Sequence, residues 1–148
     1  MQSDGPAKPQ PQPTEVSEAF WNGTREGRLR LQQCANCGKI RHYPRPICDR
    51  CYSLDVQWID ASGRGTVHSW TVAHHAYHPA FKSESPYVLL TVDLEEGVRQ
   101  MGRLEGDQAA SLRVGAPVAL GWTPTTNGYA LPNFRIVGAE DARSGTHA

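Results

Sequence analysis

Four cysteines, arranged in two pairs, are the residues in this 148-residue sequence that could most clearly do chemistry. Cys34 and Cys37 are separated by two residues, and so are Cys48 and Cys51. That spacing lets a tight turn bring both sulfurs of a pair to one side, and Gly38 gives the first turn its flexibility. Two such turns facing each other form a tetrahedral thiolate cage, which zinc prefers as a closed site. The pattern predicts a structural Zn²⁺ ion held by Cys34, Cys37, Cys48 and Cys51.

Other uses of paired cysteines are less favoured. Iron takes the same four ligands in a rubredoxin-like site, and the spacing does not distinguish the two metals. A disulfide frame needs an oxidising compartment, and Met1–Gly5 shows no basic segment followed by an apolar one, so we expect a cytoplasmic protein. Thioredoxin-like redox chemistry would need a βαβ pattern, which is missing. His42 lies between the pairs and is expected at the surface, because four thiolates already satisfy zinc.

A second group of reactive and aromatic side chains lies in one predicted loop: His74, His75, Tyr77, His78 and Phe81. Pro79 excludes the helix that would align two of these histidines on a metal, so a metal or catalytic role is less favoured. The loop is long enough to be a functional insertion that faces a ligand or partner. The sequence has no nucleophile elbow, glycine-rich phosphate loop or obvious carboxylate pair. It therefore predicts no catalytic residues.

Basic residues gather around the cysteines. Residues 27–51 hold six lysines and arginines against Asp49 alone, although the whole chain has 15 basic and 15 acidic residues. Four thiolates and one zinc ion contribute −2, which leaves about +3 on this segment. Arg41 and Arg45 are candidates to face a phosphate-bearing ligand or an acidic partner, with a solvated face as the alternative. The zero net charge argues against a protein that binds nucleic acid through its phosphates.

The elements that position these residues follow from composition and pattern. Apolar residues make up 39% and charged residues 20%, as in globular proteins, and no apolar run approaches the roughly 18 residues of a membrane span. Residues 1–13 contain four prolines and are expected to be a disordered tail. Residues 14–27 are expected to form a helix capped by Thr14. Because that helix is short, Phe20 and Trp21 must pack against another element.

Residues 28–60 read as a metal-closed ribbon, since the prolines between the cysteine pairs exclude a helix. Residues 61–138 read as β structure in which short strands alternate with Gly/Pro turns, and five such strands favour a small closed barrel over a sandwich. These strands are expected at Thr66–Val72, Tyr87–Leu94, Val98–Leu104, Val118–Trp122 and Phe134–Val137. Residues 139–148 are expected to be a loose tail. The predicted fold class is mainly β, with an N-terminal helix, a ribbon and a barrel.

The ordered motifs resemble the zinc-ribbon/OB-fold acyl-CoA-associated family over about residues 15–137. In the first half these motifs are Phe20-Trp21, Gly27–Leu29, Cys34–Gly38, Pro44–Pro46 and Cys48–Cys51. In the second half they are Gly63–Val67, Pro86–Val88, Asp93–Val98 and Val114–Val118. The resemblance implies a rubredoxin-like zinc ribbon followed by a five-stranded OB-fold barrel.

The same resemblance implies an accessory subunit that is inactive alone. Family members pair with a thiolase-superfamily or lipid-transfer-type protein, such as sterol-carrier-type thiolases or aldolases of steroid side-chain degradation, and that partner carries the catalytic residues. The OB domain helps form the acyl-CoA channel, while the ribbon and leading helix contact the partner or ligand. The matching positions are Phe20, Trp21, the basic ribbon and the loop from His74 to Phe81. A module binding single-stranded nucleic acid is the alternative, and a hydrolase or aldolase using the histidines comes last.

Overall fold

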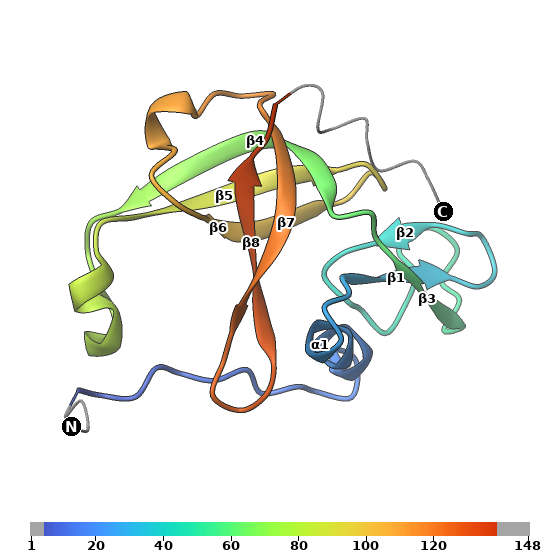
Figure 1. Cartoon of the computed structure of the whole chain (residues 1–148). Helices are drawn as coiled ribbons and strands as arrows, with labels where there is room; N and C mark the ends of the chain where they lie inside the picture. The colour runs from blue at the N-terminus through green and yellow to red at the C-terminus, as the bar shows by residue number, and fades with distance from the viewer. Residues whose placement is uncertain (1–4, 139–148) are drawn as a thin grey trace.

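The computed structural model describes residues 5–138 of the chain, and it places one helix and a small sheet beside a barrel (Figure 1). The helix α1 spans Glu18–Arg25. The small sheet has the strand order β2-β1-β3 and is antiparallel throughout. Its strands are β1 (Arg30–Cys34), β2 (Ile40–Arg41) and β3 (Val56–Asp60).

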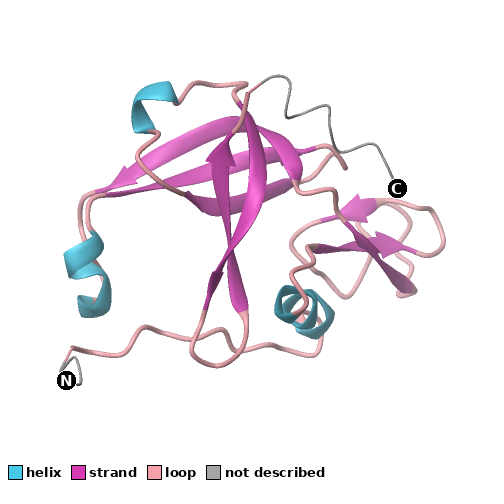
Figure 2. Ribbon diagram, in the orientation of Figure 1, coloured by secondary structure: helices cyan, strands magenta, loops and turns pink. Residues whose placement is uncertain are grey.

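The second sheet closes into a five-stranded barrel with the order β4-β5-β6-β8-β7 (Figure 2). A short parallel pairing of β6 with β8 completes the closure, and every other neighbouring pair is antiparallel. The strands are β4 (Arg64–Ala73), β5 (Tyr87–Leu94), β6 (Arg99–Leu104), β7 (Pro117–Pro124) and β8 (Ala130–Ile136). Two 3₁₀ helices connect them, η1 (Pro79–Glu84) and η2 (Ala109–Ser111). The predicted mainly β fold class with a closed five-stranded barrel is confirmed.

The barrel and the ribbon share one hydrophobic core. Alternate residues of β5 point inward, and Leu90 and Val92 are fully buried beside Phe134 of β8. Gly102 of β6 makes room for that ring, since a Cβ atom there would lie 2.7 Å from it. Phe20 of α1 and Leu31 of β1 belong to the same buried cluster. The ribbon is therefore fixed against the barrel by apolar packing as well as by its link through the chain.

The helix begins four residues later than the sequence pattern indicates. The backbone N–H of Ser17 donates to the carbonyl of Thr14 at 3.0 Å, and the Ser17 hydroxyl accepts from the Thr14 N–H at 2.9 Å. This turn uses the local hydrogen-bonding capacity of the serine side chain in place of a helical turn. Ser17 is the N-cap residue, with Glu18 in the first turn and Arg25 in the last, an arrangement that complements the helix dipole.

Residues 5–13 run along the barrel in an extended path, although their composition favours a disordered tail (Figure 1). The side chain of Asn127, in the β7–β8 turn, donates to the carbonyl of Pro11 at 3.1 Å. Lys8 forms an ion pair with Glu84 of η1. These contacts join the segment to two connections of the barrel, the β7–β8 turn and η1. The predicted loose tail at 139–148 lies outside the described residues. No helix in residues 5–138 combines the length and apolar character needed to cross a membrane.

Candidate functional site

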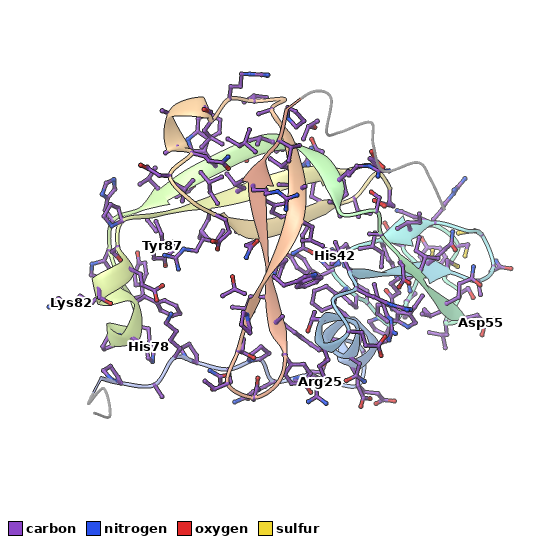
Figure 3. The ribbon with its side chains drawn as sticks, viewed as in Figure 1. Arg25, His42, Asp55, His78, Lys82 and Tyr87 are labelled. Atoms are coloured by element: carbon purple, nitrogen blue, oxygen red, sulfur yellow. The ribbon has the colours of Figure 1, made fainter. Side chains whose placement is uncertain are left out.

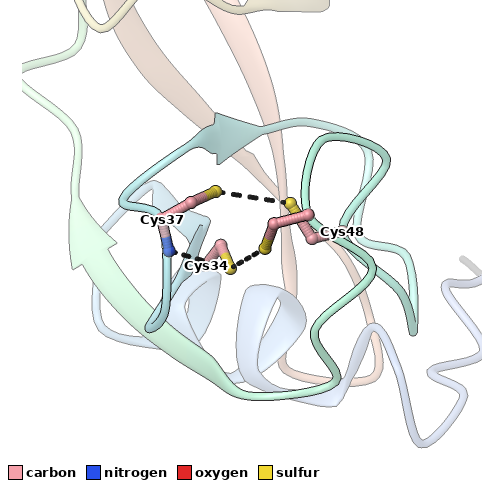
Figure 4. Close-up of side chains that lie close together, drawn as sticks. Cys34, Cys37 and Cys48 are labelled. Atoms are coloured by element: carbon pink, nitrogen blue, oxygen red, sulfur yellow. Dashed lines mark hydrogen bonds between the residues drawn. The ribbon is translucent and has the colours of Figure 1, made fainter.

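The four cysteine sulfurs converge at the tip of the ribbon (Figure 4). All four Sγ atoms lie within 4.8 Å of one another, with 3.5 Å between Cys34 and Cys51 and 3.7 Å between Cys37 and Cys48. Zinc–sulfur bonds of about 2.3 Å in a tetrahedron place the sulfurs about 3.8 Å apart. The spacing of these thiols therefore fits one tetrahedral metal ion, and the predicted ligand set is brought together by the fold.

Each cysteine pair sits in a tight turn that a backbone hydrogen bond closes. Gly38 adopts φ +75° directly after the first pair, and its N–H donates to the carbonyl of Cys34 at 2.9 Å. Tyr52 adopts φ +61° after the second pair, and its N–H donates to the carbonyl of Cys48 at 2.9 Å. The two turns are thus equivalent, although the second uses tyrosine at a position that favours glycine.

The electrostatics of the cluster favour a bound cation. The N–H of Cys37 lowers the pKa of Cys34, and the N–H of Cys51 lowers the pKa of Cys48. The N–H of Lys39 favours the Cys37 thiolate, but burial and the three neighbouring sulfurs together raise the pKa of Cys37 to about 11. Four thiolates cannot ionise together at this distance without a compensating charge, and a divalent ion supplies it. With four sulfur ligands the site is closed, so its chemistry is structural.

Arg41 of β2, one of the predicted surface residues, is largely buried. Its Nε donates to the Gln32 side-chain oxygen at 2.6 Å, and its Nη2 donates to the carbonyl of Arg45 at 3.1 Å. The backbone N–H of Arg45 donates to the same Gln32 oxygen at 2.9 Å. Gln32 and Arg41 are directly opposite each other on β1 and β2. The buried Gln32 amide therefore fixes Arg41 and the chain at Arg45 together, while the Arg45 side chain remains exposed.

His42 is half-buried at the junction of ribbon and barrel (Figure 3), and both of its ring nitrogens are shielded from solvent, so it is not the exposed surface residue that the sequence suggests. Its ring lies 5.4 Å from the Phe20 ring and 4.1 Å from the Tyr43 ring, measured between centroids. Burial lowers the pKa of His42 to about 4. The imidazole is therefore neutral near pH 7, and it lies outside the set of four converging cysteines.

The aromatic pair of the helix is divided between core and surface. Phe20 is only 5% exposed and packs edge-on against Trp21, with ring centroids 5.1 Å apart. Phe20 therefore serves the core in place of the ligand or partner surface that the resemblance implies. Trp21 is half-buried and reaches the Tyr129 ring at 6.0 Å, on the β7–β8 turn. The Arg25 guanidinium lies over the same tyrosine ring, 4.1 Å from its centroid. Two side chains of α1 therefore pack against the turn that joins β7 and β8.

The histidine-rich loop lies at the opposite end of the barrel from the ribbon tip, as the positions of His78 and Asp55 in Figure 3 show. His74, His75 and Tyr77 are exposed, Tyr77 to 94%. His78 is fixed differently, because its Nδ1 accepts from the N–H of Ala80 at 3.2 Å and caps η1. Within residues 5–138 the cysteines form the one His/Cys/Asp/Glu group close enough to hold a metal. The loop and the ribbon are therefore two separate candidate surfaces.

The loop's base is held by an arginine that sequence reasoning missed. Arg103 of β6 donates to Glu84 at 2.6 Å and stacks over the Tyr87 ring at 4.6 Å. Hydrogen bonds first from Arg103 and then from Lys8 lower the pKa of Glu84. Alternation along β6 would have placed Arg103 on the outer face, but only the barrel's pairing shows which loop it meets.

Comparisons with known proteins agree with this architecture. Residues 21–57 match the family model described as ChsH2, rubredoxin-like zinc ribbon domain, and residues 58–123 match that described as ChsH2, C-terminal OB-fold domain. The chain belongs to the ChsH2 zinc-ribbon and OB-fold family. The ribbon that closes over the four cysteines is thus a zinc ribbon, and the barrel of β4–β8 is the OB-fold domain of that family.

Curated relatives of this ChsH2-family chain are subunits or scaffolds. It is 42% identical over 118 residues to a probable enoyl-CoA hydratase alpha subunit of Thermomonospora curvata, covering 79% of this chain and 36% of the relative. It is 38% identical over 116 residues to the 3-oxo-4,17-pregnadiene-20-carboxyl-CoA hydratase alpha subunit of Mycobacterium tuberculosis, covering 78% and 36%. A DUF35 domain-containing scaffold protein of Pyrococcus furiosus is 32% identical over 109 residues, covering 73% and 78%. The chain thus spans about a third of the two hydratase subunits.

A solved structure extends the likeness to nearly a whole chain. A chain of the Ltp2-ChsH2(DUF35) aldolase superposes with a TM-score of 0.78 at 38% identity, covering 86% of this chain and 98% of that one. A DUF35-family protein from Sulfolobus solfataricus shares the fold at a TM-score of 0.56 and 16% identity, covering 83% and 86%. The ribbon-plus-barrel arrangement is therefore a recurrent unit, present both within longer subunits and as a chain of its own.

Proposed function

We propose that this protein is a non-catalytic, zinc-containing scaffold subunit of an acyl-CoA carbon–carbon bond enzyme, with a thiolase-superfamily partner that carries the catalytic residues. The observation that carries the proposal is the match to the aldolase chain, of which 98% is covered at a TM-score of 0.78. Fold alone does not carry function, but this likeness extends over nearly the whole aldolase chain at 38% sequence identity, which supports a similar role for the two chains.

The chemistry of the site supports a scaffold over an independent enzyme. The cysteine cluster has four sulfur ligands and so offers the metal no open position for water or substrate. His78 uses its Nδ1 to cap η1, and both ring nitrogens of His42 are shielded from solvent. In residues 5–138 no other metal-binding group of side chains converges. The fold provides a ribbon, a barrel and an exposed loop, which are surfaces suited to binding a partner protein.

The names of the relatives indicate the class of reaction. One relative is a benzoylsuccinyl-CoA thiolase subunit, BbsA, of Geobacter metallireducens, with 29% identity over 79 residues, covering 53% of this chain and 51% of the relative. Another is a steroid-CoA hydratase alpha subunit, and the solved neighbour is an aldolase. We infer cleavage of an acyl-CoA thioester by thiolysis or retro-aldol chemistry, with steroid side-chain CoA thioesters as the favoured substrates. In this proposal the OB-fold domain helps to form the acyl-CoA channel against the partner.

The loop at Tyr77 and the ribbon tip at Leu54 are the two surfaces best suited to docking. Tyr77 is 94% exposed and Leu54 is 69% exposed, and each lies next to an anchored element. Exposed apolar side chains that gather in a patch mark protein-binding sites, and the ribbon adds Tyr52, which is 79% exposed, and Ile47, which is 48% exposed, to Leu54. The two surfaces lie at opposite ends of the molecule, so they can be tested separately.

The test is affinity purification of the tagged chain from its native host, with Tyr77→Ser and Leu54→Ser as matched variants. We expect a thiolase-superfamily protein to co-purify with the parent chain and to lose affinity for one of the two variants. The purified complex should cleave an acyl-CoA thioester that the chain alone leaves intact. Recovery of the chain without such a partner, or turnover by the chain alone, contradicts the proposal.

A further inference from the structure

A groove of about 410 Å³ lies between the ribbon and the OB-fold domain, where the β5–β6 turn reaches toward β2 (Figure 1). The ribbon contributes Arg41, Tyr43 and Arg45 to its walls, and the barrel contributes Asp93 and Arg99. Its volume is within the range of small-molecule sites and exceeds the needs of a bare inorganic ion. The groove is distinct from the cysteine cluster and from the histidine-rich loop.

The charges of the groove are unbalanced. Four cations and two carboxylates line it, and the carboxylates are already engaged with neighbouring cations. Lys39 donates to Asp49 at 2.6 Å, and Arg99 donates to Asp93 at 2.8 Å. The remaining cations, Arg41 and Arg45, have no carboxylate within ion-pair distance among residues 5–138. The groove thus carries two positive charges in excess.

The excess positive charge of the groove is unfavourable chiefly because Arg41 is buried. The residue is only 6% exposed, its Nη1 has no hydrogen-bond partner, and its two bonds go to the neutral oxygens of Gln32 and Arg45. A buried charge without a counter-charge is unfavourable, and an anion at the groove would remove that cost. The Gln32 oxygen also holds the backbone at Arg45. The Arg45 backbone is thereby fixed against the Arg41 guanidinium before any ligand arrives, and the exposed Arg45 side chain starts from that point.

We propose that this groove binds a phosphate group, with Arg41 beneath it and Arg45 at its rim. A phosphate oxyanion carries up to two negative charges and several acceptor oxygens, which match paired guanidinium groups. The volume of the groove accommodates an organic moiety attached to the phosphate. Two sources share this chemistry: the phosphates of a coenzyme A nucleotide and free phosphate. The nucleotide source rests on the proposed function, whereas the phosphate site itself does not.

The test uses the zinc-loaded full chain, without a partner, and follows backbone amide chemical shifts at constant ionic strength. The probes are inorganic phosphate, adenosine 3′,5′-bisphosphate and, as a phosphate-free control, adenosine. We expect saturable shifts at Arg41, Tyr43 and Arg99 with both phosphate probes and none with adenosine. Tighter binding of the bisphosphate assigns the site to nucleotide phosphates, and equal binding assigns it to free phosphate.

Arg45→Gln is the decisive variant, because its side chain makes no hydrogen bond in the structure and its backbone contacts are kept. We expect it to weaken phosphate binding by about tenfold. Arg50→Gln is the matched control, since it removes one exposed charge from the same ribbon outside the groove. It should leave the affinity unchanged.

Two results would overturn the site: shifts that do not saturate, or equal weakening by Arg45→Gln and Arg50→Gln, which indicates diffuse charge attraction. Because these measurements use the chain alone, their failure is distinguishable from failure of the scaffold proposal, which the purification experiment tests. Conversely, phosphate binding by a chain that captures no partner would leave the groove site intact.

Discussion

The hydroxyl oxygen of Thr24 in α1 accepts a hydrogen bond, 3.2 Å long, from the backbone N–H of Ala130 at the start of β8. The same hydroxyl donates to the carbonyl of Trp21 at 2.7 Å, so it is satisfied in both roles. Thr24 is only 2% exposed. One buried side chain therefore ties the N-terminal helix to the closing strand of the barrel, 106 positions away.

Replacing Thr24 with valine keeps the shape of the side chain and leaves the Ala130 N–H without its acceptor. We expect the free energy of unfolding to fall by about 1–3 kcal/mol, because an unpaired buried donor retains its full desolvation cost. Urea denaturation of the zinc-loaded chain measures the change. Thr66→Val, on an exposed position of β4, should change stability by less than about 0.5 kcal/mol. Equal effects of the two substitutions would show that the Thr24 contact is not the cause.

Removal of one zinc ligand should unfold the ribbon. Cys48→Ser replaces a buried thiolate by a weak ligand, and the ribbon is too small to hold its knuckles together without a metal. We expect less than one zinc per chain, and hydrogen exchange of β1–β3 that approaches the unfolded rate. Ala35→Ser adds a hydroxyl to an exposed position of the first knuckle and should keep the metal. Full protection of β1–β3 in a zinc-free Cys48→Ser chain would contradict a structural role for the ion.

His42 predicts a specific dependence of stability on pH. Its folded-state pKa is lowered to about 4 from an ordinary 6.5, so the unfolded chain binds the proton more tightly between these values. The stability from the neutral, buried ring is therefore complete above about pH 6.5 and declines as the pH falls toward 4. The slope approaches about 1.4 kcal/mol per pH unit.

His42→Phe should flatten this slope between pH 5 and 7, because an apolar ring replaces the titrating one beside Phe20. His74→Asn removes an exposed histidine and should keep the slope of the parent chain. Denaturation at several pH values, with bound zinc assayed at each, provides the measurement. A parent slope that persists in His42→Phe would assign the pH dependence to other groups.

Glu84 connects the N-terminal segment to the barrel through Lys8 and Arg103. Glu84→Gln should destabilise the chain by less than about 1 kcal/mol, as is usual for ion pairs near the surface, and should speed hydrogen exchange in residues 5–13. Because the folded-state pKa of Glu84 is lowered, the difference from the parent should be present at pH 7 and disappear well below pH 4.5. Glu15→Gln, at an exposed position, is the control. Unchanged exchange in residues 5–13 would show that they are held by other contacts.

The parts of the structure that local patterns dictate could be predicted from the sequence. The spacing of the cysteines fixed the ligand set, because two residues between cysteines permit few backbone turns. Alternation along Tyr87–Leu94 indicated a strand with one buried face, and β5 has the same bounds. The Gly/Pro turns between five short strands indicated the closed barrel.

The parts that depend on tertiary contacts, on strand register or on competing local hydrogen bonds could not be predicted in this way. His42 reads as a loop residue, and its ring nitrogens are shielded from solvent only because the ribbon lies on the barrel. In the sequence Gln32 is an ordinary polar strand residue, and only the strand register places it opposite Arg41. The helix start moved from Thr14 to Glu18 because Ser17 forms a local turn that competes with the cap. The first two outcomes depend on which elements the fold brings together. The third depends on which of two local hydrogen-bonding patterns the backbone adopts.

Native mass spectrometry of the tagged chain, purified gently from its host, tests the central claim most directly, because one spectrum reports metal and partner together. The account predicts a chain that carries one zinc ion and is bound to a thiolase-superfamily subunit. A spectrum that shows only the free chain, without metal, would contradict it.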